Sequence, residues 1–226
     1  MEVGTVFGSP RWLAIRLLGN VVEHMMVGLV VFSVVNFAAA TLGSKAGYVM
    51  GSFQLHIAFS VCGYQLLMVE AILSFSNDGP MGTVISRRTK RVVHMVLASL
   101  GVISSLTGAV LGIQTYGAKF DTAHGICGLI ALMLSLLSCL NGFISFFSTR
   151  LGDRVNPSTI KAVHTICGSL AVTMGLVTLI LGLNKPQHFV FFKGRETATC
   201  LIIFVMLIQI YAMMRPMESL KGHMGR

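Results

Sequence analysis

Six long apolar runs divide the chain, and they constrain its fold more than any other feature. They lie near residues 17–42, 52–75, 92–114, 122–147, 162–183 and 197–214. A helix needs roughly 20 apolar residues to cross a hydrocarbon core about 30 Å thick, and each run is close to that length or longer. Because 54% of the residues are hydrophobic and only 11% are charged, a soluble domain could not bury these runs. The sequence predicts an all-α membrane protein with six transmembrane helices.

The segments between the runs are short, so we expect a single transmembrane domain over residues 1–226. The first run is too long for a secretory signal sequence and lacks a cleavage site, so it should remain a spanning helix. Positively charged loops stay in the cytoplasm. A cytoplasmic N-terminus places 12 of the 17 Lys and Arg residues, and both termini, on that side. The formal net charge of +9 is then explained by the orientation of the helices in the membrane. Nucleic acid is therefore not an expected partner.

Four histidines stand near the starts of four successive predicted helices: His56, His94, His124 and His164. Neighbouring helices run antiparallel, so His56 and His124 should lie near the non-cytoplasmic face, and His94 and His164 near the cytoplasmic face. Two of the four belong to a repeat, since HGICGL at His124 is similar to HTICGSL at His164. A polar residue within the membrane costs free energy unless it is paired or ligating, which makes each histidine a candidate functional residue. For any single histidine, the alternative is an ordinary hydrogen bond between helices.

Small residues follow each histidine along one helix face. Positions four and seven residues further on share that face, and all eight are small: Ser60, Gly63, Ala98, Gly101, Gly128, Ala131, Gly168 and Ala171. Close helix packing also favours small residues, but it would not require a histidine at the head of every strip. A porphyrin needs both an axial imidazole and room beside it. The pattern therefore predicts a central four-helix bundle that holds two b haems.

Each haem would be bound by two histidines, His56 with His124 and His94 with His164. Because both axial positions are filled, such a haem carries electrons. Zinc fits less well, since neither pair has a third and a fourth ligand at a suitable depth. The two haem levels would lie about 15 to 20 Å apart within the hydrocarbon core. Electron transfer across the membrane is then geometrically feasible.

These motifs resemble the cytochrome b561 family of transmembrane reductases, in particular its short branch of cytochrome b561 domain-containing proteins. The resemblance extends from about Phe53 to Gly182 and is carried by the four histidines with LMVEAILSFS, RRTKRVVHM, HGICGL and HTICGSL. It implies a six-helix protein, a haem-binding core over about 52–183, and a homodimer. It also implies electron transfer from cytosolic ascorbate through two b haems to monodehydroascorbate or ferric iron on the opposite side. We therefore expect an ascorbate-dependent oxidoreductase, in the endoplasmic reticulum or a vesicle membrane rather than the plasma membrane.

Cationic side chains beside two of the histidines predict where the donor binds. Arg87, Arg91 and His94 are spaced i, i+4 and i+7, and Lys161 precedes His164 by three residues. Ascorbate and haem propionates are both anionic, so either could bind these cations. The positive-inside rule alone would also place arginines here.

The opposite rim is less basic. Phe53 and Asp121 occupy the positions three residues before His56 and His124. Such a rim suits a cationic acceptor such as iron, although Asp121 could equally be the N-cap of its helix.

Three further polar residues, Glu23, His24 and Glu70, fall in the cytoplasmic halves of the first two predicted helices. We expect them to make buried hydrogen bonds or ion pairs, and His24 could also contact the cytoplasmic haem.

Two other functions stay open: a proton- or metal-coupled transporter that uses His and Glu, and a haem-free scaffold for another membrane protein. A transporter would need polar residues near the bilayer midplane, and the middle stretches VCGYQLLM, ASLGVISS, ALMLSLL and AVTMGLV contain no acidic residue.

Overall fold

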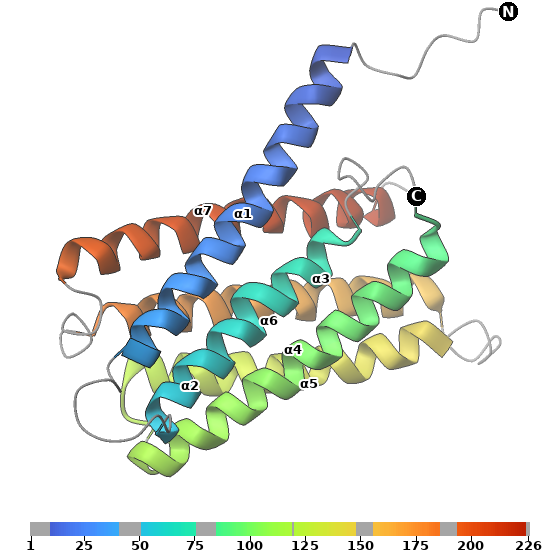
Figure 1. Cartoon of the computed structure of the whole chain (residues 1–226). Coiled ribbons are helices and arrows are strands. Elements are labelled where there is room, and N and C mark those ends of the chain that lie inside the picture. Colours follow the sequence, from blue (N-terminus) through green and yellow to red (C-terminus); the bar gives the residue numbers. More distant parts are fainter. Residues whose placement is uncertain are drawn as a thin grey trace, which may run out of the picture.

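The computed structural model describes residues 10–40, 51–75, 85–118, 120–147, 156–185 and 194–224, and within these ranges it contains helices and short turns but no strand. The prediction of an all-α protein is therefore confirmed. The elements are α1 (Pro10–Ala40), α2 (Ser52–Val61), the π-helical segment η1 (Cys62–Met68), α3 (Val69–Leu73), α4 (Arg87–Tyr116), α5 (Ala123–Phe147), α6 (Pro157–Leu183) and α7 (Arg195–Met224). α2, η1 and α3 form one continuous rod, so the described chain consists of six rods (Figure 1).

Five of these rods are long and apolar enough to cross a membrane: Ser52–Leu73, Arg87–Tyr116, Ala123–Phe147, Pro157–Leu183 and Arg195–Met214. α1 differs, because its apolar part is the shorter stretch Val21–Asn36. The charged residues Arg11, Arg16 and Glu23 interrupt its first half. The rods are consistent with a multi-pass integral membrane protein, and a sixth span through α1 stays a prediction.

Capping residues start α4 and α6 well before the apolar runs begin. The hydroxyl of Ser86 accepts a hydrogen bond from the backbone N–H of Thr89, and the side chain of Asn156 accepts from that of Ser158. Both are favoured N-cap residues. As a result His94 and His164 do not lie at the helix starts. Each lies seven residues inside, two turns from Arg87 and Pro157 respectively.

The start of α5 corrects one alternative for Asp121. The side-chain oxygen of Thr122 accepts a hydrogen bond from the backbone N–H of Gly125 at 3.2 Å. Thr122 immediately precedes the first helical residue, Ala123, and occupies the N-cap position. An N-cap side chain must reach the N–H groups of the first turn, and that of Thr122 does so. Asp121 lies one residue further from the helix and is exposed. His124 is thus the second residue of its helix.

The rods pack in a definite order (Figure 1). α4 lies along α2 and η1 on one side and contacts α5 on the other, while α6 lies along α5 and also contacts η1. The order around this arrangement is therefore α2–η1, α4, α5 and α6, in which α2 is diagonal to α5 and α4 is diagonal to α6. α1 and α7 pack on the outside, against each other and against η1, α3 and α6. The first turns of α1 project beyond the other rods.

Large aliphatic side chains cover the outer faces of the rods. Ile103 of α4, Leu140 of α5 and Ile210 of α7 are each at least 60% exposed. Apolar surface of this extent is unusual for a soluble monomer and suits contact with lipid. The inner faces instead carry small residues and the aliphatic core between α1, α6 and α7, which includes Val30 and Leu176.

Candidate functional site: two histidine pairs

The structure brings the four predicted histidines together in two pairs. The ring centres of His56 and His124 are 6.1 Å apart, and those of His94 and His164 are 5.9 Å apart. The two rings of each pair are nearly perpendicular, at 89° and 88°. Each pair joins helices that are diagonal in the packing order, α2 with α5 and α4 with α6. The paired rings therefore meet across the middle of the arrangement.

All four rings are held in the same way by a neighbouring helix. The Nδ1 atom of each ring lies 2.7 to 3.0 Å from a backbone carbonyl oxygen: His56 on Gly108, His94 on Ala71, His124 on Thr178 and His164 on Ser138. A carbonyl oxygen can only accept, so Nδ1 carries the proton, and a neutral ring then has its lone pair on Nε2. Metal-ligating histidines are usually fixed by such a bond from the second ring nitrogen.

A glycine lies four residues after three of the four accepting carbonyls. A Cβ atom at Gly112 would lie 2.8 Å from Nδ1 of His56, one at Gly142 would lie 2.9 Å from Cε1 of His164, and one at Gly182 would lie 3.1 Å from Cε1 of His124. These contacts are tighter than ordinary packing allows. Glycine therefore provides the space in which the ring can reach the carbonyl one turn earlier.

The fourth site differs from the other three. The equivalent position, four residues after Ala71, is Phe75, and its ring packs against His94 with the ring centres 5.0 Å apart. The glycine pattern is not evident from the sequence alone, although its spacing is readable once the hydrogen-bond partners are known.

The small-residue strips serve helix packing, which corrects their expected role as room beside a porphyrin. Gly63 lies against Ser105 of α4, Gly128 against Thr178 of α6, and Gly168 against Ser138 of α5. The reason is geometric. Each histidine bonds to the neighbouring helix, so residues four and seven positions later, on the same face, also meet that helix.

A polar layer lies between the two histidine levels. The hydroxyl of Tyr64 lies 3.3 Å from that of Ser135, which in turn donates to the carbonyl of Ala131. Gln65 is completely buried at the centre of η1, and neither polar atom of its side chain has a hydrogen-bond partner among the described residues. The four middle stretches contain no acidic residue, so this layer lacks the carboxylates of a proton relay.

The predicted donor residues lie on the surface. α4 begins at Arg87, so Arg87, Arg91 and His94 belong to one continuous helix, but Arg87, Arg91 and Lys161 are all exposed. The buried cation near His94 is Lys90, which is only 4% exposed and lies one turn before it. Lys90 is not among the predicted donor residues, although a spacing of four residues places it on the same helix face as His94. At the opposite end, Phe53 packs edge-on against Tyr116, with ring centres 5.8 Å apart.

Two of the three further polar residues are joined by a hydrogen bond. Nδ1 of His24 on α1 lies 2.8 Å from Oε1 of Glu70 on α3, and Glu23 is only 5% exposed. This pair joins α1 to the turn of α3 that holds His94.

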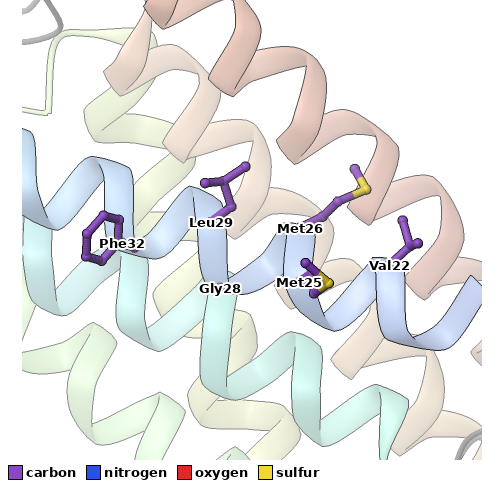
Figure 2. A pocket seen from close by; sticks show the side chains of 6 residues that line it. All are labelled: Val22, Met25, Met26, Gly28, Leu29 and Phe32. Atoms are coloured by element: carbon purple, nitrogen blue, oxygen red, sulfur yellow. The ribbon is translucent and has the colours of Figure 1, made fainter. Parts of the chain in front are cut away.

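An apolar groove of about 520 Å³ runs beside α1 (Figure 2). Its lining consists of Val22, Met25, Met26, Gly28, Leu29 and Phe32, from successive turns of one helix. None of these side chains ionises, and the histidine pairs lie on other helices. The groove is therefore not part of the candidate site.

Comparison with known proteins identifies the family. The family model for eukaryotic cytochrome b561 matches residues 55–190, which include all four paired histidines. The chain belongs to the cytochrome b561 family.

Curated relatives agree with this assignment. The cytochrome b561 chain is 27% identical over 180 residues to transmembrane reductase CYB561D2 of mouse (Mus musculus), and equally to that of human (Homo sapiens), covering 77% of each chain. It is 25% identical over 214 residues to the mouse probable transmembrane reductase CYB561D1, covering 89% of this chain and 87% of the relative. The resemblance inferred from the motifs is thereby confirmed.

The paired histidines fit the b-type haem of this family. A metal–imidazole bond of about 2 Å on each side of one iron would place two ring centres roughly 6 Å apart, close to both observed separations. Among the described residues, no three His, Cys, Asp or Glu side chains come together as a metal site. A porphyrin provides four equatorial ligands itself and needs only two from the protein. The donor set therefore suits haem better than zinc.

Proposed function

We propose that this cytochrome b561 is a transmembrane oxidoreductase that binds two b haems, one at His56 and His124 and one at His94 and His164. The observation that carries the proposal is the contact of Nδ1 with a backbone carbonyl oxygen that all four rings share. Each ring donates from Nδ1 to a carbonyl, which leaves Nε2 of both members of a pair available to one iron. When bound, a haem of this kind supplies a one-electron carrier with no open axial position.

The protein contributes rigid ligands and an apolar surrounding. Backbone carbonyls orient the rings, glycines allow their close approach, and the diagonal helices bring each pair to the middle of a four-helix bundle over about 52–183. Tyr64 and the serines near it occupy the space between the two levels. Because both axial positions are filled by protein, a substrate would exchange electrons at the haem edges rather than bind to iron.

The donor and acceptor are proposed from charge and from the family. Ascorbate would bind on the cytoplasmic side near Arg87, Arg91 and Lys161, and electrons would leave to monodehydroascorbate or ferric iron on the other side. Both termini would be cytoplasmic, since α1 begins and α7 ends on the side of His94. We further propose a homodimer in the membrane of the endoplasmic reticulum or of vesicles.

Absorption spectroscopy of the purified protein tests the proposal directly. We expect a red protein with a low-spin b-type spectrum, about two haems per chain, and absorbance changes on addition of ascorbate. A colourless, folded protein would contradict it and would favour a transporter or a scaffold.

Gly142→Ala should displace the ring of His164, because the added Cβ would lie 2.9 Å from Cε1. We expect weaker haem binding at this level, by roughly the 10- to 100-fold typical of a lost supporting contact to a metal ligand. Haem titration of the apoprotein measures it. Gly28→Ala is the matched control, since nothing lies within 4 Å of a Cβ there. Equal affinities for the two variants would contradict the role of Gly142.

Replacing Arg87 and Arg91 together by Gln should slow reduction by ascorbate roughly tenfold at low salt and less at high salt, since exposed charges attract an anion weakly and are screened. The haem spectrum should stay nearly unchanged. Stopped-flow reduction of oriented vesicles measures the rate, and Arg195→Gln, an exposed arginine at the other end, is the control. A double variant as fast as the wild type at low ionic strength would exclude this donor site.

A further inference from the structure

His24 and Glu70 form a contact that the proposed electron path does not use. A carboxylate only accepts hydrogen bonds, so His24 donates its Nδ1–H to Oε1 of Glu70 at 2.8 Å. Nε2 of His24 is then the nitrogen that can accept a proton. The next residue after Glu70 is Ala71, whose carbonyl accepts the Nδ1–H of His94. The pair therefore adjoins the turn that holds one of the proposed haem ligands.

The surroundings of His24 are negative. Among the described residues, the charged groups that act on it are Glu70, on α3, and Glu23, the residue before it on α1. The side chains of His24 and Glu70 are 38% and 22% exposed, so neither is sealed inside the helix bundle. A proton on Nε2 would convert a neutral ring bonded to a carboxylate into an imidazolium–carboxylate pair, which is a charge-assisted hydrogen bond.

The other histidine level has no equivalent among the described residues. The acidic residues described at that end, Asp121 and Glu196, are both exposed. An electron that arrives at a buried centre adds a negative charge where the dielectric constant is low, and a nearby positive charge then lowers its energy more than it would in water. Among the described residues, a partly buried pair that can accept a proton is thus present at one level only.

We propose that the His24–Glu70 pair accepts a proton when an electron arrives at the His94–His164 level; this inference rests on the proposed function. The ascorbate monoanion loses one electron and one proton when it becomes the monodehydroascorbate radical anion. The proton released from its O–H bond would be bound at Nε2 of His24, where an N–H bond forms, and a b haem held at that level would be the oxidant that takes up the electron. One negative and one positive charge are added together, so the net charge of the site is unchanged.

His24→Asn removes the nitrogen that would accept the proton and keeps the hydrogen bond to Glu70. The side-chain amide of Asn can occupy the place of Nδ1 and still donate to Glu70, but it has no equivalent of Nε2. A His124→Ala background should leave only the haem of the His94–His164 level. Redox titration of this variant by absorbance should show a midpoint potential that falls with rising pH. One proton per electron corresponds to about 59 mV for a tenfold change in proton concentration. His24→Asn should remove most of this slope, and Glu196→Gln should retain it.

A kinetic measurement on the chain with both haems gives a second readout. His24→Asn should slow reduction by ascorbate at least about tenfold, as expected for loss of a general base. Reduction by a one-electron reductant that releases no proton should be unchanged. A potential independent of pH in the parent protein, or an unchanged slope in His24→Asn, would overturn the proposal. Absence of any b-type spectrum would overturn the proposed function as well, so the two failures are distinguishable.

Discussion

Replacing His94 by Ala should leave purified protein with the haem of the His56–His124 level alone, and His164→Ala should give the same spectrum. The reason is that one iron would lose one of its two axial imidazoles, and loss of a direct ligand costs more than the 10- to 100-fold typical of a supporting contact. Electron transfer across the membrane should then fall below detection. Haem-to-protein ratios and stopped-flow reduction of oriented vesicles measure both effects.

The reciprocal variants are the control. His56→Ala and His124→Ala should remove the other haem and leave the His94–His164 spectrum intact. The pairing would be wrong if one member of each pair, such as His56 and His94, proved to share an iron.

Gly63→Ala should destabilise the whole protein, because the added Cβ would overlap the hydroxyl oxygen of Ser105 and lie 2.9 Å from its backbone nitrogen. A side chain can rotate away, but a backbone atom moves only if η1 separates from α4. Overpacking of this kind costs about 1–3 kcal/mol. Thermal unfolding followed by absorbance should show a lower Tm, and haem should be lost from both levels together.

The two levels respond together because the same helices hold both. His56 bonds to α4 and His94 bonds to α3, so separation of η1 from α4 loosens both bonds. Gly28→Ala should instead leave the Tm unchanged or slightly higher, since alanine favours a helix by up to about 1 kcal/mol where nothing opposes it. Equal stability of Gly63→Ala and Gly28→Ala would contradict the close contact.

Much of this protein can be derived from the amino-acid pattern. Apolar runs of spanning length predict the helices, because in hydrocarbon a backbone must satisfy its hydrogen bonds locally. The end of the helix at which each histidine lies follows from its place along a run. Alternation of antiparallel helices then decides which histidines share a side. These are properties of local sequence and of chain direction, so no tertiary contact is needed to derive them.

The rotation of each helix about its own axis was decided only by the tertiary structure. In a membrane both the lipid-facing and the core-facing sides are apolar, so hydrophobic periodicity does not distinguish them. For this reason the sequence predicts the small-residue strips beside a porphyrin, whereas in the structure they pack against neighbouring helices. For the same reason Lys90, rather than Arg87 or Arg91, is the buried cation near His94.

Contacts between distant segments could not be predicted from the sequence either. His24 and Glu70 are 46 residues apart, and His124 reaches a carbonyl 54 residues away on Thr178. A backbone carbonyl has no residue type of its own, so no motif reveals which one a histidine will bind. Only the packed helices bring that carbonyl to Nδ1, and this bond determines which ring nitrogen stays available for iron.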